Sequence, residues 1–139
     1  MTATPATPAA ASPSKTRNRV LWVLQIVFGL FFIFVSALPK LFGVQSAVDS
    51  FDDIGFGQWF RYVTGIVELA GGIGLLVPRL SGLAAAGLSI TTVLAAATQA
   101  FLLDAPGLAP FPLILAVLFA WIAYERRDTI SGLGNLVRR

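Results

Sequence analysis

Four long apolar segments limit what this chain can fold into. Each has about the 20 residues that a helix needs to cross roughly 30 Å of hydrocarbon. Only 12% of the 139 residues are charged, against about 25% in an ordinary soluble domain, so the composition excludes a soluble globular protein. We therefore predict an all-α integral membrane protein, a four-helix bundle. The predicted spans cover about residues 20–41, 59–77, 80–103 and 108–124.

The basic residues sort unequally between the two sides of this predicted bundle. One side receives eight Lys and Arg residues, and the other receives only Lys40 and Arg61. Because loops rich in Lys and Arg stay in the cytoplasm, we expect both termini there. These charges flank apolar runs and form no basic surface on a soluble domain, so no nucleic acid is expected as a partner. The eight residues are Lys15, Arg17, Arg19, Arg79, Arg126, Arg127, Arg138 and Arg139.

Three regions follow from these spans. Residues 1–19 begin with an uncharged stretch of Ala, Thr, Pro and Ser and are predicted to be a disordered cytoplasmic tail. Residues 20–127 form the transmembrane domain, in which the loop 43–58 is either a short interfacial helix or an irregular loop. Residues 128–139 form a cytoplasmic basic tail with apolar residues at helical spacing, and we expect it to rest on the anionic inner leaflet.

The chain contains neither Cys nor His, which excludes several kinds of chemistry. Disulfides, thiol redox reactions, a haem histidine and the usual zinc sites all need one of these residues. We therefore expect no metal site and no intrinsic cofactor. Any redox role has to come from a bound quinone or from a partner protein.

Glu68 lies at the middle of the second predicted span. It is roughly 13 Å from either end at the rise of a helix, too deep for a short carboxylate to reach water. A carboxylate at this depth costs a few kcal/mol, so it is expected to be protonated, paired or next to a wet cavity. Helical side chains lean toward the N-terminus of their helix, so Lys40, at the end of the first span, and Glu68 converge. Arg61 leans away from Glu68 and is predicted to be a headgroup anchor.

Polar and small residues share one face in each of the first three spans, and in the first span these polar residues are Gln25, Ser36 and Lys40. Turning the three faces inward gives close helix contacts at glycines and a polar pocket around Lys40 and Glu68. In the alternative interpretation, Lys40 is an interfacial anchor and a protonated Glu68 only holds helices together. The predicted ligand-binding residues are Lys40, Glu68, Thr64, Thr91, Thr98 and Gln99. The predicted helix-packing residues are Gly29, Gly65, Gly71, Gly72 and Gly87.

Several motifs resemble one family of small bacterial membrane proteins. The first span closes on Ser36-Ala-Leu-Pro-Lys40, and the second contains Thr64-Gly-Ile-Val-Glu68-Leu-Ala-Gly71. Together with Ile54-Gly-Phe-Gly-Gln58 and Leu75-Leu-Val-Pro78, they resemble the DoxX-like family over about residues 20–127. The resemblance implies a four-helix bundle in the bacterial cytoplasmic (inner) membrane, with Lys40 and Glu68 at family-pattern positions. Some relatives are linked to membrane redox systems, including the small subunit of thiosulfate:quinone oxidoreductase and complexes that respond to oxidative stress.

From this resemblance we expect a membrane subunit or accessory of a redox or oxidative-stress system, with a pocket for a quinone or a small polar ligand. The chain is not expected to be an enzyme alone, and any activity would belong to a quinone-linked oxidoreductase that contains it. The expected partners are the lipid bilayer, a redox partner protein and further copies of the chain in a homo-oligomer. Two alternatives stay open. One is a non-catalytic scaffold or assembly factor whose partner binds around residues 51–56, and the other is a small-molecule transporter, for which four helices leave little room.

Overall fold

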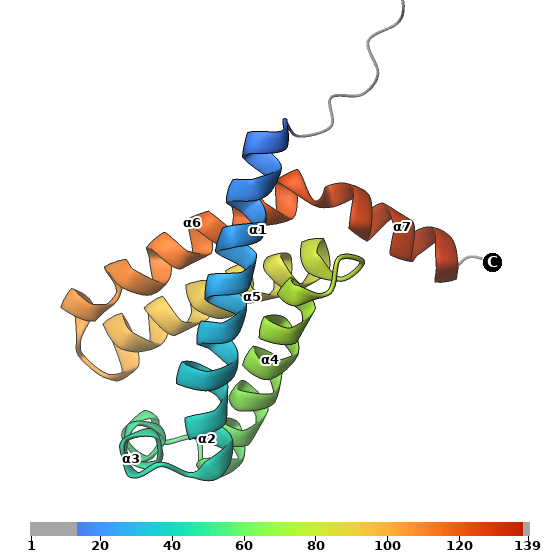
Figure 1. The fold of residues 1–139 in the computed structure, drawn as a ribbon. Coiled ribbons are helices and arrows are strands. Elements are labelled where there is room, and N and C mark those ends of the chain that lie inside the picture. The colour runs from blue at the N-terminus through green and yellow to red at the C-terminus, as the bar shows by residue number, and fades with distance from the viewer. Residues whose placement is uncertain (1–13, 138–139) are drawn as a thin grey trace, which may run out of the picture.

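The computed structural model describes residues 14–137, and this part of the chain is almost entirely helical (Figure 1). The first long helix, Lys15–Phe42, consists of α1 (Lys15–Leu30), the π-helical η1 (Phe31–Ala37) and α2 (Leu38–Phe42). No strand occurs between residues 14 and 137, so the predicted all-α fold is confirmed. The remaining elements are α3 (Gln45–Ile54), α4 (Gln58–Leu76), α5 (Ser81–Ala97), η2 (Thr98–Leu102), η3 (Pro106–Leu108), α6 (Pro110–Glu125) and α7 (Arg127–Val137).

The long helices form two antiparallel pairs (Figure 1). In the first pair α1 packs against α4, and in the second α5 packs along α6 and crosses the first pair obliquely. Helix α4 also contacts α5, so it joins the two pairs. The short helix α3 lies across the end where α2 meets α4, and α7 leaves the opposite end of the molecule.

Three of the described helices are long and apolar enough to cross a membrane. They are Lys15–Phe42, Ser81–Leu102 and Pro106–Glu125. The helix at the second predicted span, α4, has 19 residues but is not among these three. It carries Arg61 and Glu68, and these two charged residues lower its mean hydropathy.

The first helix begins earlier than the sequence pattern suggests. The Ser14 hydroxyl accepts a hydrogen bond from the backbone N–H of Arg17 at 3.1 Å. This N-cap satisfies one of the amide donors that have no partner in the first turn of a helix. The predicted disorder is therefore wrong for residues 15–19, and residues 1–13 of that predicted tail lie outside the described part of the chain.

The first long helix widens into a π-helix just before Pro39. Proline has no N–H and its ring clashes with the preceding turn, so it disturbs the hydrogen bonding of the helix before it. Here the N–H of Leu38 donates to the carbonyl oxygen of Ile33, five residues back. Helix α2 then stops at Gly43, whose φ of 73° is left-handed. The irregular turn therefore lies immediately before the lysine of the candidate site.

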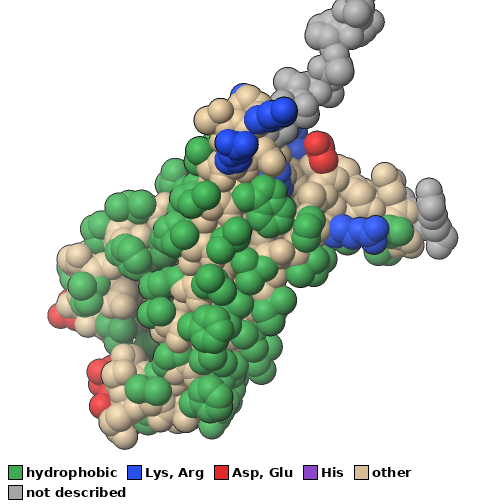
Figure 2. Space-filling model, viewed as in Figure 1, with side chains coloured by type: hydrophobic (Ala, Val, Ile, Leu, Met, Phe, Trp, Pro, Cys, Tyr) green, Lys and Arg blue, Asp and Glu red, His purple; other side chains and the backbone are tan. Residues whose placement is uncertain are grey.

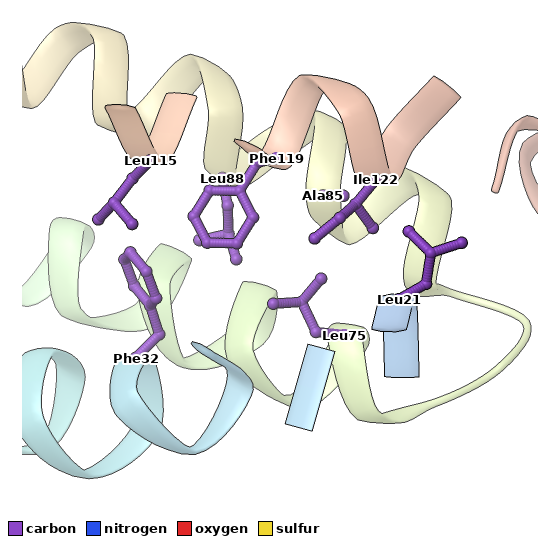
Figure 3. Packing of buried hydrophobic residues seen from close by; sticks show 8 residues of the cluster. All are labelled: Leu21, Phe32, Leu75, Ala85, Leu88, Leu115, Phe119 and Ile122. Carbon is purple, nitrogen blue, oxygen red and sulfur yellow. The ribbon is translucent and has the colours of Figure 1, made fainter. Parts of the chain in front are cut away.

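A core of apolar side chains joins α1, η1, α4, α5 and α6 (Figure 3). Phe119 of α6 is fully buried, and its ring centroid lies 5.9 Å from that of Phe28 and 5.5 Å from that of Phe32. Both pairs have the edge-to-face arrangement that aromatic rings prefer. The core consists of Leu21, Phe32, Leu75, Ala85, Leu88, Leu115, Phe119 and Ile122.

Charged side chains gather at two opposite ends of the molecule, and apolar side chains cover the face between them (Figure 2). At the first end Arg17 of α1 pairs with Glu125 of α6 at 3.4 Å. The apolar belt between the ends includes exposed side chains such as Ile66, Ile90 and Ile114, which suit contact with lipid. The first end, called the basic end, carries Lys15, Arg17, Arg19, Arg79, Arg126 and Arg127. The opposite end, called the acidic end, carries Asp49, Asp52, Asp53 and Asp104.

Candidate functional site

Lys40 and Glu68 form an ion pair between α2 and α4. The Lys40 Nζ lies 2.8 Å from Glu68 Oε2, and the Ser36 hydroxyl donates to the same oxygen at 2.9 Å. Only 19% of the Lys40 side chain and 9% of the Glu68 side chain are exposed. The carboxylate at the middle of α4 is therefore paired, which offsets the cost of placing it among apolar helices.

The local structure of the first helix brings Ser36 and Lys40 to the same carboxylate. Ser36 lies in η1 and Lys40 one turn later in α2, so both side chains leave the helix on one side. Gly65 of α4 lets the two helices approach each other, because an added Cβ there would lie 3.0 Å from the Leu41 side chain and 3.3 Å from the Lys40 Cβ. Gly65, one turn before Glu68, therefore leaves room for the Lys40 side chain.

The hydrogen bonds of the pair leave one acceptor free. The three N–H groups of Lys40 Nζ have three acceptors: Glu68 Oε2, the Ser36 hydroxyl at 3.0 Å and the Ser36 carbonyl at 3.2 Å. Glu68 Oε2 accepts from both Lys40 and Ser36, whereas Oε1 accepts from no described residue. Oε1 is also not a fully enclosed atom. It is therefore the atom of this cluster that a ligand can reach with a hydrogen-bond donor.

Arg61 does not act as a headgroup anchor, contrary to the prediction from its helix position. Its side chain is 5% exposed, and its Nη1 donates to the carbonyl oxygen of Lys40. Its Nε donates to Gln58 Oε1 at 2.7 Å. The carbonyl groups in the last turn of a helix lack hydrogen-bond donors within that helix. Arg61 is such a donor for the Lys40 carbonyl of α2. The guanidinium also stacks on Tyr62, 4.3 Å from the ring centroid.

Gln58 extends this network to the acidic end, and sequence reasoning missed its role. Its Nε2 donates to Asp52 Oδ1 at 2.7 Å and to the backbone oxygen of Val48 at 3.0 Å, both in α3. A continuous series of hydrogen bonds thus joins α3, through Gln58 and Arg61, to the backbone of Lys40. The spacing of Gln58 and Arg61, three residues apart in the first turn of α4, was the available signal.

None of the other predicted ligand-binding residues forms a hydrogen bond with Glu68 in the described part of the chain. The hydroxyls of Thr64, Thr91 and Thr98 each donate at 2.8 Å to the carbonyl oxygen four residues earlier in their own helix. Gln99 lines a separate cavity of about 390 Å³ at the acidic end, together with residues of α3 and the loop after η2. The buried polar residues of α5 are instead Ser81 and Thr92, which are 1% and 3% exposed.

The predicted packing glycines divide into two groups. Gly29 and Gly72 lie at the closest approach of α1 and α4, because an added Cβ on either would come within about 3 Å of the other's carbonyl oxygen. An added Cβ on Gly71 would lie 2.6 Å from the Leu88 side chain of α5, and Gly65 is packed as described above. Gly87 differs from the prediction: it is exposed, and a Cβ there would meet nothing within 4 Å.

A second polar cluster near the basic end was not predicted. Gln25 is fully buried, and its Nε2 donates to the backbone oxygen of Leu75 at 2.9 Å. Its Oε1 accepts from Arg126 Nε at 2.9 Å, and Arg126 Nη1 donates to Asn18 Oδ1 at 2.8 Å. Burial lowers the pKa of Arg126 below its ordinary value, and the neighbouring Glu125 carboxylate opposes this effect. The polar face of the first span was the signal for Gln25, but its partner lies 101 residues away in sequence.

Comparison with known proteins and protein families identifies the family to which the chain belongs. Within residues 14–137, no group of three or more acidic side chains is placed to hold a metal ion. No curated protein and no solved structure matches the chain. The model of the DoxX-like family matches residues 23–122, which include the Lys40 and Glu68 site and most of each of the four long helices. The chain is an integral membrane protein that belongs to the DoxX-like family.

Proposed function

We propose that α4 is a fourth membrane span and that the chain lies in the bacterial inner membrane with both termini in the cytoplasm. Helix α4 packs between α1 and α5, which both belong to candidate spans. Its two charged side chains have partners within the protein, so neither requires water. Both described ends of the chain lie at the basic end, which the excess of Lys and Arg favours as the cytoplasmic side.

We further infer that the Lys40 and Glu68 pair binds the polar head of a small lipophilic ligand that carries a hydroxyl, such as a quinol. The free oxygen Oε1 of Glu68 carries this proposal. The N–H groups of Lys40 and the hydroxyl of Ser36 already donate within the cluster, so the site offers an acceptor but no free donor. A quinol hydroxyl fits this site better than the carbonyl oxygen of an oxidised quinone.

The position of Glu68 favours a ligand with an apolar body. It lies at the middle of a helix whose neighbours are apolar spans, so a ligand that reaches it passes apolar side chains. The ring hydroxyl and isoprenoid tail of a quinol meet both requirements. Lys40 and Ser36 would then act as positioning residues that fix the Glu68 carboxylate in one orientation.

The residue types present favour an accessory role in a redox or oxidative-stress system. The chain has no Cys or His, so it contains no thiol and no imidazole to carry electrons or bind haem. In this proposal the chain holds the ligand in the membrane as a subunit, and a redox partner protein carries out electron transfer.

Ligand retention by variants tests this site. Purified protein in lipid nanodiscs would be incubated with decylubiquinol, and the bound quinol measured by native mass spectrometry. We expect both Glu68→Gln and Lys40→Met to lose most of the bound quinol. In Glu68→Gln the neutral amide is a weaker hydrogen-bond acceptor than the carboxylate. In Lys40→Met the Glu68 carboxylate has lost the cation that holds it in position. The control is Thr91→Val, since the Thr91 hydroxyl binds only its own helix. Equal retention by folded Glu68→Gln and the parent protein would refute the site.

A non-catalytic scaffold is the second candidate, and exposed aromatic residues at the acidic end favour it. Phe42 is 80% exposed, and Phe56 and Trp59 lie exposed on either side of the start of α4. This surface suits a partner protein at the membrane boundary. A Phe42→Ser and Phe56→Ser double variant would then lose a co-purifying partner, whereas Val117→Ser on the apolar belt would keep it. Unchanged co-purification by both variants would argue against a scaffold that uses this surface.

A further inference from the structure

The last helix, α7, is held across the basic end instead of continuing α6. Helix α6 ends at Glu125 and α7 begins at Arg127, so only Arg126 separates them. The Thr129 hydroxyl accepts from the backbone N–H of Gly82 at 3.1 Å and donates to the Arg126 carbonyl at 2.6 Å. An added Cβ on Gly82 would lie 2.5 Å from that hydroxyl, so the first turns of α5 and α7 are in close contact. Figure 1 shows α7 extending away from the other helices beyond this contact.

One face of α7 continues from this contact as an apolar stripe. Thr129, Leu133 and Leu136 are spaced by four and three residues, which places them on the same side of a helix. Ile130 and Val137 lie next to this line, whereas Ser131 and Asn135 fall on the opposite side. The side of α7 that touches α5 is therefore also its apolar side.

No other described part of the protein covers the outer half of this stripe. Leu136 is 56% exposed and Val137 is 86% exposed. The stripe lies at the level of Gly82, in the first turn of the candidate span Ser81–Leu102, and it faces the same way as the contact with α5. At the end of a span this is the boundary between hydrocarbon and headgroups. Lipid is therefore the medium that the exposed stripe meets.

The charges around α7 indicate which lipids suit this helix. Arg127 begins the helix, and the sequence continues with Arg138 and Arg139 directly after it. Arg126 and Arg79 lie nearby at the basic end. Basic residues beside an amphipathic helix attract anionic headgroups, and this attraction adds to the burial of apolar side chains. Gly132 and Gly134 weaken the helix in water, so contact with lipid contributes to its stability.

We propose that α7 is an interfacial anchor that buries Leu133, Leu136 and Val137 in the leaflet at the basic end and binds anionic lipid headgroups through Arg127 at its start and the nearby Arg79. This role is separate from ligand binding at Glu68, and each can fail without the other.

Spin labels on opposite faces of α7 test this proposal in the full chain. The protein has no Cys, so Leu133→Cys and Asn135→Cys each give one labelling site, and the second is the matched control. Each labelled protein would be placed at low density in vesicles of phosphatidylcholine with phosphatidylglycerol. We expect the label at 133 to collide several-fold less with a neutral water-soluble nickel complex, and several-fold more with oxygen, than the label at 135. Val137→Cys and Ser131→Cys repeat the comparison in case either first variant misfolds.

Lipid composition tests the anionic part of the proposal. In vesicles of phosphatidylcholine alone, and for the variant that combines Arg127→Gln and Arg79→Gln, we expect the difference between the two faces to shrink. Equal access of the nickel complex to both faces would overturn the anchor. Protection at 133 that disappears when the protein is diluted in lipid would place a second copy there instead and also overturn it. Protection that is the same with and without phosphatidylglycerol would overturn the role of anionic lipid.

Discussion

The two carboxylate oxygens of Glu68 have different hydrogen-bond partners. Oε2 accepts from Lys40 and Ser36, while Oε1 stays accessible. The sequence predicted the approach of Lys40 and Glu68, because the leaning direction of side chains in antiparallel helices decides it. It placed Ser36 on the same polar face as Lys40, but it did not predict the hydrogen bond from the Ser36 hydroxyl to Glu68. It also misplaced Arg61, because the free carbonyls at the end of α2 come close to α4 only in the folded chain.

At the residue scale, we predict that Lys40 stabilises the protein chiefly by neutralising the Glu68 carboxylate. Lys40→Met leaves the Glu68 carboxylate without a cation, and we expect the free energy of unfolding to fall by about 3 kcal/mol or more. The double variant Lys40→Met with Glu68→Gln removes the unpaired charge and should recover most of this loss. Reversible denaturation of the three proteins in one detergent measures the difference. A double variant no more stable than Lys40→Met would contradict the paired state of Glu68.

Arg61 gives a second prediction at this scale. Its guanidinium binds the Lys40 carbonyl and Gln58 at once, which a lysine cannot do with the same geometry. We expect both Arg61→Gln and Arg61→Lys to lower the free energy of unfolding by about 1–3 kcal/mol, because buried acceptors lose a donor. Arg79→Gln, at an exposed position of the turn between α4 and α5, is the control and should change little. Full stability of Arg61→Lys would show that one charge suffices.

At the scale of the helices, the sequence predicted where the long helices lie more reliably than which side of each faces the protein. All four long helices fall on the predicted spans because apolar length is a strong signal. In α5 the predicted inward stripe contained Gly87 and Thr91, but the structure buries Leu88 and Thr92. The polar residues Ser89, Thr91 and Thr92 are spread over more than one side of this helix, so its sequence gives little contrast between the protein-facing and lipid-facing sides.

The glycines supply a matched test of helix packing. In Gly72→Ala the new methyl group would lie 2.9 Å from the Gly29 carbonyl oxygen and from Ile33, so α1 and α4 must separate. We expect a loss of about 1–3 kcal/mol in the free energy of unfolding. Gly87→Ala adds the same methyl group in open space and should be neutral or stabilising by up to about 1 kcal/mol through helix propensity. Equal effects of the two substitutions in thermal unfolding would contradict the close approach of α1 and α4.

At the scale of the whole molecule, the proposed orientation rests on the separation of charge into two ends. Arg17, Glu125 and Arg126 meet at the basic end, and Asp53 and Asp104 line one cavity at the acidic end. The count of Lys and Arg predicted this separation from sequence, because each predicted loop could be assigned to a side. It could not predict the oblique crossing of the two helix pairs, which depends on how side chains fit at the α4 and α5 contact.

Reporter fusions test the proposed orientation. Green fluorescent protein fused after Arg139 should fluoresce, and alkaline phosphatase fused there should be inactive, because that end is expected in the cytoplasm. Truncated fusions after Ser50 in α3 should give the opposite result for both reporters. Similar activity at the two positions would mean that an odd number of segments does not separate them, and the proposed topology would be wrong.

The hydrogen bond from Arg126 to Gln25 has a consequence for how the protein is made. It connects the first long helix to the residue that follows the last one, so it forms only when the whole membrane domain has been synthesised. Until then the side-chain oxygen of Gln25 lacks this donor in an apolar setting, at a cost of about 1–3 kcal/mol. A chain truncated before residue 126 keeps that defect permanently. During biogenesis, this hydrogen bond is thus present in the full membrane domain and absent from a truncated chain.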